Sequence, residues 1–155
     1  MGTLTAMTQA ASAPKKVFLI EDSVLLRDAL CDMLTEIGEV SLVGTAQSED
    51  EALQALESTE ADLVIVDLAL KSGTGLGVLT ALREQPSRYH SPAAVVLSNH
   101  AYPQMRSRCS NLGALAFFDK SLQLPDLLAF VRDYANTAAV GAAASVAPEI
   151  RSAAH

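Results

Sequence analysis

The sequence predicts an α/β fold, a doubly wound sandwich in which helices cover both faces of a five-stranded parallel sheet. Five short apolar runs, at residues 17–20, 42–46, 63–66, 93–97 and 115–118, alternate with segments of helical periodicity. More than a dozen residues separate each run from the next, which is the length that a helical crossover between parallel strands needs. Runs such as LVIV and AAVVL are continuously apolar, as expected for strands that are buried on both faces.

The first predicted helix lies between the first two strands. Leu26, Leu30, Leu34 and Ile37 recur at three- and four-residue spacing, which places them on one face of a helix. Gly38 follows directly, and glycine suits the left-handed position that commonly comes after a helix. We therefore expect the helix to stop at Gly38.

The second and third helices are marked at one end each. Ser48 followed by Glu51 is the pattern of a capping box at a helix start. A stripe that runs from Leu76 to Leu82 must end before Pro86, because the residue before a proline is disfavoured in helical backbone. The GTGLG segment at residues 73–77 lacks the lysine of a phosphate-binding loop, and we interpret it as a flexible loop.

Prolines mark the starts of the last two helices. Pro103 suits the first turn of a helix that continues to Leu112. Pro125 suits the first turn of a helix whose apolar face includes Tyr134. Five helices thus alternate with the five strands.

One domain accounts for residues 15–136. Residues 1–14 are small and polar without periodicity, and we predict a disordered tail there. Residues 137–155 are rich in alanine and interrupted by Gly141 and Pro148, so we predict a second tail. Neither tail is long enough for another folded module, and we expect no output domain.

Composition excludes two classes of partner. The chain carries a formal net charge of −7, which argues against direct binding to nucleic acid. No apolar stretch approaches the roughly 18 residues of a membrane span, and the start has no leader pattern, so we expect a cytoplasmic protein without membrane insertion. Cys31 and Cys109 lack metal-ligand spacing and are interpreted as ordinary thiols.

Polar residues follow four of the five strands. Glu21 and Asp22 follow the first, Asp67 the third, Ser98 the fourth, and Lys120 comes shortly after the fifth. Ligands of open parallel sheets bind beyond the carboxyl ends of the strands, so these side chains form the candidate site.

The three carboxylates at these strand ends predict a divalent cation. They would repel each other and raise one another's pKa unless a cation neutralised them, and oxygen ligands of this kind suit Mg²⁺. With the ion bound, one carboxylate can act as a nucleophile toward phosphorus, and Lys120 and Ser98 can then hold the phosphoryl oxygens.

These motifs resemble the response-regulator receiver family over roughly residues 15–135. The resemblance rests on the acidic pair in VFLIEDS, the hydroxyl residue in AAVVLSN and the lysine in GALAFFDKS. It rests further on the acidic residue in ADLVIVDLAL, which Gly75 follows eight positions later. The family implies the flavodoxin-like strand order 2-1-3-4-5 for this chain.

The resemblance also implies a role for each acidic residue. Asp67 would accept a phosphoryl group from the phosphohistidine of a sensor histidine kinase or a phosphotransfer protein. Asp22, Asp67 and the backbone carbonyl of Ala69 would bind Mg²⁺, and Glu21 would act on the ion directly or through water.

Three further residues receive roles from the resemblance. Lys120 would pair with the phosphoryl group, and Ser98 would donate a hydrogen bond to it and draw the following loop inward. Phe117 matches the family's aromatic switch position and, having no hydroxyl, would act by packing alone. We expect the fourth helix, the fifth strand and the fifth helix to form the face that changes on phosphorylation.

Four positions depart from the commonest family pattern. Ser121 follows the lysine, and Lys71 lies four residues after Asp67, where proline is common in both cases. Asn99 and His100 follow the hydroxyl residue, where a small side chain usually comes first. Because of Asn99 and His100, we do not predict from the family how partners reach the loop after Ser98.

The leading hypothesis is a single-domain response regulator that is not an enzyme in its own right. Its output would be phosphorylation-dependent contact with a downstream protein target, and a homodimer is compatible with the sequence. One alternative is a receiver-like adaptor that is never phosphorylated. Another is a Mg²⁺-dependent phosphatase, although enzymes of the haloacid-dehalogenase type usually place a second acid where this chain has Ala69.

Overall fold

The computed structural model describes residues 13–138. Most of both predicted tails therefore lies outside the described residues. At the carboxyl end, however, Thr137 and Ala138 still belong to the last helix, two residues beyond the predicted limit of the domain.

A five-stranded parallel sheet forms the centre of the molecule, in the order β2-β1-β3-β4-β5. Both the predicted fold class and the predicted strand order are confirmed. The strands are β1 (Lys15–Ile20), β2 (Val40–Ala46), β3 (Leu63–Val66), β4 (Ala93–Ser98) and β5 (Phe117–Asp119).

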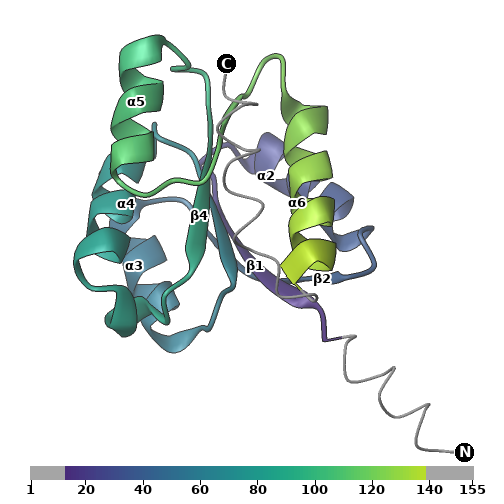
Figure 1. The fold of residues 1–155 in the computed structure, drawn as a ribbon. Helices are drawn as coiled ribbons and strands as arrows, with labels where there is room; N and C mark the ends of the chain where they lie inside the picture. Colours follow the sequence, from purple (N-terminus) through teal and green to yellow (C-terminus); the bar gives the residue numbers. More distant parts are fainter. Residues whose placement is uncertain (1–12, 139–155) are drawn as a thin grey trace, which may run out of the picture.

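Helices cover both faces of the sheet (Figure 1). On one face lie α2 (Val24–Thr35) and α6 (Leu124–Ala138); on the other lie α3 (Glu49–Ser58), α4 (Gly75–Glu84) and α5 (Pro103–Asn111). A short 3-10 helix that the sequence analysis did not predict, η1 (Pro86–Tyr89), follows α4 and buries Tyr89 in the core.

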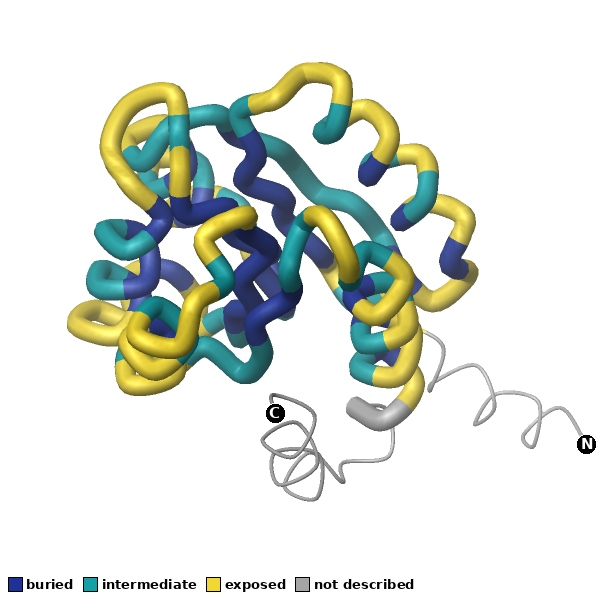
Figure 2. The backbone as a smooth tube through the Cα atoms, turned by 90° about the horizontal axis from the view of Figure 1, so that it is seen from above, coloured by how far each residue is buried: buried dark blue, intermediate teal, exposed yellow. Residues whose placement is uncertain are grey.

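Successive side chains of the central strands enter two separate cores. In β1, Val17 and Leu19 pack toward α2 and α6, whereas Phe18 and Ile20 pack toward the other three helices. Because side chains alternate between the faces of a strand, burial on both faces requires an unbroken apolar run. Figure 2 shows most residues of β1, β3 and β4 as buried tube at the centre, with exposed backbone on the outer sides of the helices.

The first helix ends differently from our prediction. Helix α2 stops at Thr35, and its cap residue Glu36 keeps right-handed backbone with its N–H bonded to the Leu34 carbonyl. The left-handed glycines of the described region are Gly73 and Gly113, so the prediction of a left-handed Gly38 was wrong. A turn closed by backbone hydrogen bonds ends the helix without glycine geometry.

The predicted cap of the second helix forms in a modified way. The Ser48 hydroxyl accepts the Glu51 N–H at 3.3 Å, as a capping box requires. The Glu51 carboxylate accepts the N–H of Gln47 at 2.9 Å, although the usual donor is the N–H of the cap residue itself. The cap therefore also secures the end of the loop that follows β2.

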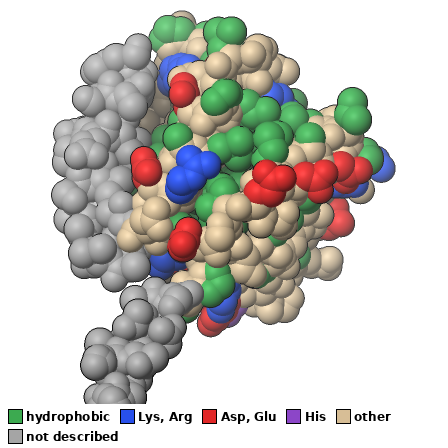
Figure 3. Space-filling view, turned by 90° about the vertical axis from the view of Figure 1, so that its right-hand side faces the viewer, with side chains coloured by type: hydrophobic (Ala, Val, Ile, Leu, Met, Phe, Trp, Pro, Cys, Tyr) green, Lys and Arg blue, Asp and Glu red, His purple; other side chains and the backbone are tan. Residues whose placement is uncertain are grey.

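The outer surface carries charges of both signs. Figure 3 views the side of the molecule that holds α2 and α6, where acidic and basic groups lie scattered around apolar ones. Helix α2 begins with two exposed apolar residues, Val24 and Leu25. Within residues 13–138, no helix has both the length and the apolar character needed to cross a membrane.

The two cysteines should differ strongly in reactivity. Burial raises the pKa of the fully buried Cys109 thiol to about 11. Burial, and next the charge of Asp28, also raise the pKa of Cys31, but that side chain is only half-buried. Alkylation requires the thiolate, so iodoacetamide at about pH 8 should modify Cys31 well before Cys109, as followed by intact mass.

The rate at Cys109 should rise as the pH approaches its raised pKa, because the thiolate fraction increases there. Cys31→Ser should remove the fast step and leave the slow one. Two equally fast thiols in the native protein would contradict the packing of α5 against the sheet.

Candidate functional site

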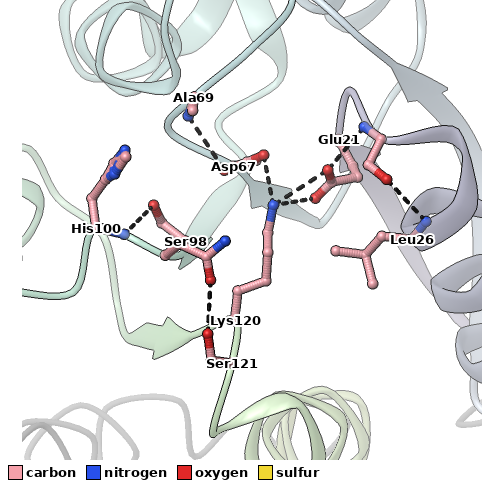
Figure 4. Close-up of polar contacts among 10 residues, drawn as sticks. Glu21, Leu26, Asp67, Ala69, Ser98, His100, Lys120 and Ser121 are labelled. Carbon is pink, nitrogen blue, oxygen red and sulfur yellow. Dashed lines mark hydrogen bonds and ion pairs between the residues drawn. The ribbon is translucent and has the colours of Figure 1, made fainter.

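The carboxyl ends of four strands meet at one edge of the sheet. Glu21 and Asp22 follow β1, Asp67 follows β3, Ser98 ends β4, and Lys120 follows β5. Because β1 and β3 are neighbours in the sheet, their acidic residues lie side by side, and Lys120 reaches them from the side of β5 (Figure 4). The strand ends thus bring Glu21, Asp22, Asp67 and Lys120 together.

A buried ion-pair triad forms the centre of the site. The Lys120 ammonium lies 2.8 Å from Asp67 Oδ2 and 3.0 Å from Glu21 Oε1. The side chains of Glu21 and Asp67 are 1 % and 3 % exposed, and that of Lys120 is 15 % exposed. Such weak exposure makes the attraction strong but also makes the desolvation of each charge costly.

Burial and neighbouring charges shift two of these groups. Burial raises the pKa of Glu21, and the charge of Asp67 adds to this, against the opposing effects of the Ser23 N–H and Lys120. For Lys120, burial alone lowers the pKa, but the hydrogen bonds and charges of Asp67 and Glu21 outweigh it and raise the pKa. Lys120 is therefore firmly protonated, and Glu21 holds its proton more readily than an ordinary glutamate.

The geometry fits a divalent cation. Glu21, Asp22 and Asp67 each place a carboxylate oxygen within 4.8 Å of the others. Glu21 Oε1 is buried and has no hydrogen-bond partner among the described residues, since its contact with Lys120 lacks hydrogen-bond geometry. An unsatisfied buried oxygen beside two other carboxylates suits a hard cation such as Mg²⁺.

Ala69 lies beside this acidic cluster. Its N–H donates to Asp67 Oδ1 at 3.3 Å, so the loop after β3 folds back over the acid (Figure 4). An antiparallel bridge from Ala69 to Thr74 closes the loop. The backbone that the sequence analysis assigned to the metal is thus next to the carboxylates.

Ser98 and Phe117 lie outside the ion-pair triad. Ser98 is buried, and its hydroxyl oxygen accepts the His100 N–H at 3.1 Å, the usual arrangement of a serine at the start of a loop. The Phe117 side chain is buried at the start of β5. The ring lies under the Arg106 guanidinium, whose importance the sequence analysis missed.

The glycine-rich segment at residues 73–77 is only partly a loop. Gly75 and Gly77 belong to α4, so our prediction of a flexible loop was wrong for them. A β-carbon on Gly75 would overlap the Asp67 carbonyl and the backbone of Leu68. Glycine therefore allows α4 to begin directly against the end of β3.

Contact with Glu49 explains why glycine occupies positions 73 and 77. Its N–H donates to the Ser72 carbonyl at 3.0 Å, and its Oε1 accepts the Thr74 N–H at 3.0 Å. A β-carbon on Gly73 or Gly77 would collide with the Glu49 carboxylate. Negative charge is favourable at a helix start, so this carboxylate fastens the loop between β3 and α4 to the start of α3.

A double-mutant cycle should detect this contact. Gly77→Ala alone should gain little stability or lose some, because the new methyl group displaces the Glu49 carboxylate. In the Glu49→Ala background the same change should stabilise by about 1 kcal/mol, the usual advantage of alanine over glycine in a helix. Urea unfolding of the four proteins gives the coupling energy.

The control for this cycle is Asp50→Ala, since Asp50 is exposed and adjacent in α3. It should show no coupling to Gly77→Ala. Additive effects of Glu49→Ala and Gly77→Ala would show that the carboxylate does not occupy the space above α4.

Lys120→Met should destabilise the protein in a pH-dependent way. Removing one partner from a buried ion pair costs about 3–5 kcal/mol, because Glu21 and Asp67 stay buried without compensation. The folded-state pKa of Glu21 is already raised and will rise further without the ammonium, so the folded state takes up a proton as the pH falls. The loss should therefore be larger near pH 8 than near pH 5, as measured by urea unfolding.

Lys16→Met is the matched control, because Lys16 pairs with Glu60 on the surface, where the two side chains are 46 % and 66 % exposed. That change should cost about 1 kcal/mol or less. Equal losses at both pH values for Lys120→Met would contradict the burial of the unpaired carboxylates.

Comparisons with known proteins identify the family of this chain. The model of the response regulator receiver domain family matches residues 17–132. The transcriptional regulatory protein PdtaR of Mycobacterium tuberculosis is 32 % identical over 118 residues, which cover 76 % of this chain and 55 % of PdtaR. A Bacillus subtilis protein-glutamate methylesterase is 27 % identical over 106 residues, 68 % of this chain and 29 % of the enzyme. The chain thus spans about half, or less, of these relatives.

Solved structures share the fold. The response regulator domain of Thermotoga maritima CheB has a TM-score of 0.70 at 18 % identity, over 79 % of this chain and 97 % of that one. A chain of the CheX-CheY-BeF3-Mg complex from Borrelia burgdorferi matches with a TM-score of 0.70 at 21 % identity, over 81 % of this chain and 90 % of that one. A Burkholderia pseudomallei response regulator matches with a TM-score of 0.65 at 22 % identity, over 84 % of this chain and 74 % of that one. With its family match over most of the chain, this protein belongs to the response regulator receiver domain family.

Proposed function

We propose that the protein is a two-component signalling switch in which Asp67 accepts a phosphoryl group in a Mg²⁺-dependent reaction. The observation that carries the proposal is the convergence of Glu21, Asp22 and Asp67 with the Lys120 ammonium at one sheet edge. Receiver domains interact with histidine kinases or phosphotransfer proteins, and we infer a donor of this kind here.

The transfer is a substitution at phosphorus. An Asp67 carboxylate oxygen forms a bond to phosphorus while the bond from phosphorus to the donor imidazole nitrogen breaks, so the imidazole leaves with the electron pair. The Lys120 ammonium lies 2.8 Å from Asp67 Oδ2. It can pair with a phosphoryl oxygen instead as the carboxylate becomes an acyl phosphate. Phosphoryl transfer depends mainly on such positioning and charge neutralisation.

Mg²⁺ would be held by Glu21, Asp22, Asp67 and the Ala69 carbonyl. When bound, it supplies positive charge that neutralises the carboxylates and the phosphoryl oxygens. One structural relative contains BeF3 and Mg, and another contains a phosphorylated aspartic acid and a calcium ion. Both combinations support the same chemistry in this chain.

The signal would leave the site through Ser98 and Phe117. The Ser98 hydroxyl now accepts a backbone N–H, which leaves its own hydrogen available for a phosphoryl oxygen. That bond exists in only one of two conformations and so shifts the population toward it. A downstream protein would then recognise the face formed by α5, β5 and α6. Location in the cytoplasm, lack of direct nucleic-acid binding and homodimer formation stay predictions.

Incubation with Mg²⁺ and acetyl phosphate should add one phosphate to the wild-type protein, as detected by intact mass. Asp67→Asn should gain none, because an amide does not form the acyl phosphate. EDTA should prevent the gain in the wild type. Asp119→Asn is a suitable control, since this acid is the last residue of β5 but lies outside the acidic cluster of Glu21, Asp22 and Asp67.

The outcome separates the competing functions. No gain, together with no spectral response to Mg²⁺ and beryllofluoride, would contradict the switch and favour the adaptor that is never phosphorylated. Repeated turnover of small phosphate esters would favour the phosphatase.

A further inference from the structure

Arg106 connects three segments near the site. It lies half-buried on α5 and donates from Nε to the Ala101 carbonyl at 3.2 Å, and from Nη1 to the Phe117 carbonyl at 3.1 Å. Its Nη2 donates to Gln123 Oε1 at 3.2 Å. One guanidinium therefore reaches the loop after β4, the strand β5 and the loop after β5.

The same guanidinium lies 4.9 Å from the centre of the Phe117 ring. Arginine can donate hydrogen bonds and contact an aromatic ring at the same time, because its planar group carries donors in its plane and stacks through its faces. Lysine has a single nitrogen and cannot make these contacts together. The buried position of Phe117 is thus held from its backbone and from its ring.

Gln123 extends the connection toward Lys120. Its Oε1 also accepts the Asp119 N–H at 2.9 Å, and its Nε2 donates to Asp126 of α6 at 3.4 Å. Among residues 13–138, β5 is the last strand of the sheet, so the Asp119 N–H and the Phe117 carbonyl on its outer side have no strand partner there. Gln123 and Arg106 satisfy these two groups.

Two further hydrogen bonds join the same loops nearer the site. The Lys120 N–H donates to the Ser98 carbonyl at 3.1 Å, and the Ser121 hydroxyl donates to Asn99 Oδ1 at 3.1 Å. The loop that begins at Ser98 and the loop that begins at Lys120 are therefore bonded to each other at the first two residues of each. A displacement of one loop must carry the other with it or break these bonds.

We propose that Arg106 is a positioning residue that makes the loop after Ser98, the strand β5 and the start of α6 move together with α5. This inference rests on the proposed function, since the displacement that it transmits is the one caused by phosphorylation of Asp67. Arg106 touches no reacting atom. It determines how far a change at Ser98 spreads to the face formed by α5, β5 and α6.

The first part of the test uses the protein without ligand. Amide hydrogen exchange, measured by NMR, should be about tenfold faster at Asp119 in Arg106→Met, because Gln123 loses the group that fixes it. The exchange rate at Asp119 in Arg106→Lys should fall between those of the wild type and Arg106→Met. Arg108→Met is the control on the same helix, where Arg108 is exposed, and it should match the wild type.

The second part measures the response to phosphorylation. Wild type and variants are loaded with acetyl phosphate and Mg²⁺, and amide shift changes over residues 101–111 and 117–126 are compared at equal phosphate occupancy. In the wild type and Arg108→Met, both segments should change together. In Arg106→Met the change over residues 101–111 should fall severalfold, while the change next to Asp67 stays.

The two proposals fail separately. Exchange at Asp119 that is unchanged in Arg106→Met, or a full response of α5 in that variant, would overturn the role of Arg106 even if Asp67 is phosphorylated. A wild type that takes up no phosphate would overturn the proposed function, and the exchange measurement would then decide alone whether Arg106 ties the loops together.

Discussion

The structure depends above all on balancing negative charge that is buried at the carboxyl ends of the strands. Glu21 and Asp67 are almost fully buried, Asp22 lies beside them, and Lys120 is the ammonium that pairs with the two buried acids. Burying a charge without compensation costs far more than a typical side-chain contact gains. The site is therefore held in a state that favours the arrival of more positive charge, and the surrounding loops have to keep this arrangement in place.

Two sets of side-chain contacts hold these loops from opposite sides. On one side, Glu49 fastens the loop after Asp67 to the start of α3, and the glycines around it leave the necessary space. On the other, Arg106 and Gln123 connect the loops that follow β4 and β5. Hydrogen bonds of a charged side chain hold both loops, the first through Glu49 and the second through Arg106.

Much of the architecture followed from local patterns, because burial on both faces leaves a clear apolar run in β1, β3 and β4. The strand order came from resemblance, and the clustering of Glu21, Asp67 and Lys120 followed once that order was assumed. Glu49 and Arg106 could not be found in this way, since neither belongs to a motif and their contacts with residues 73–77 and with Phe117 arise only in the folded chain. The end of α2 was also missed, because a turn of ordinary backbone replaced the expected left-handed glycine.

The short strand β5 has a consequence for self-association. An exposed edge strand offers free backbone groups to which a strand of another chain can add, and this is a common route to aggregation. In β5 the Arg106 and Gln123 side chains already occupy the outward carbonyl of Phe117 and the outward N–H of Asp119. A second chain cannot extend the sheet at these two positions without displacing the side chains of Arg106 and Gln123.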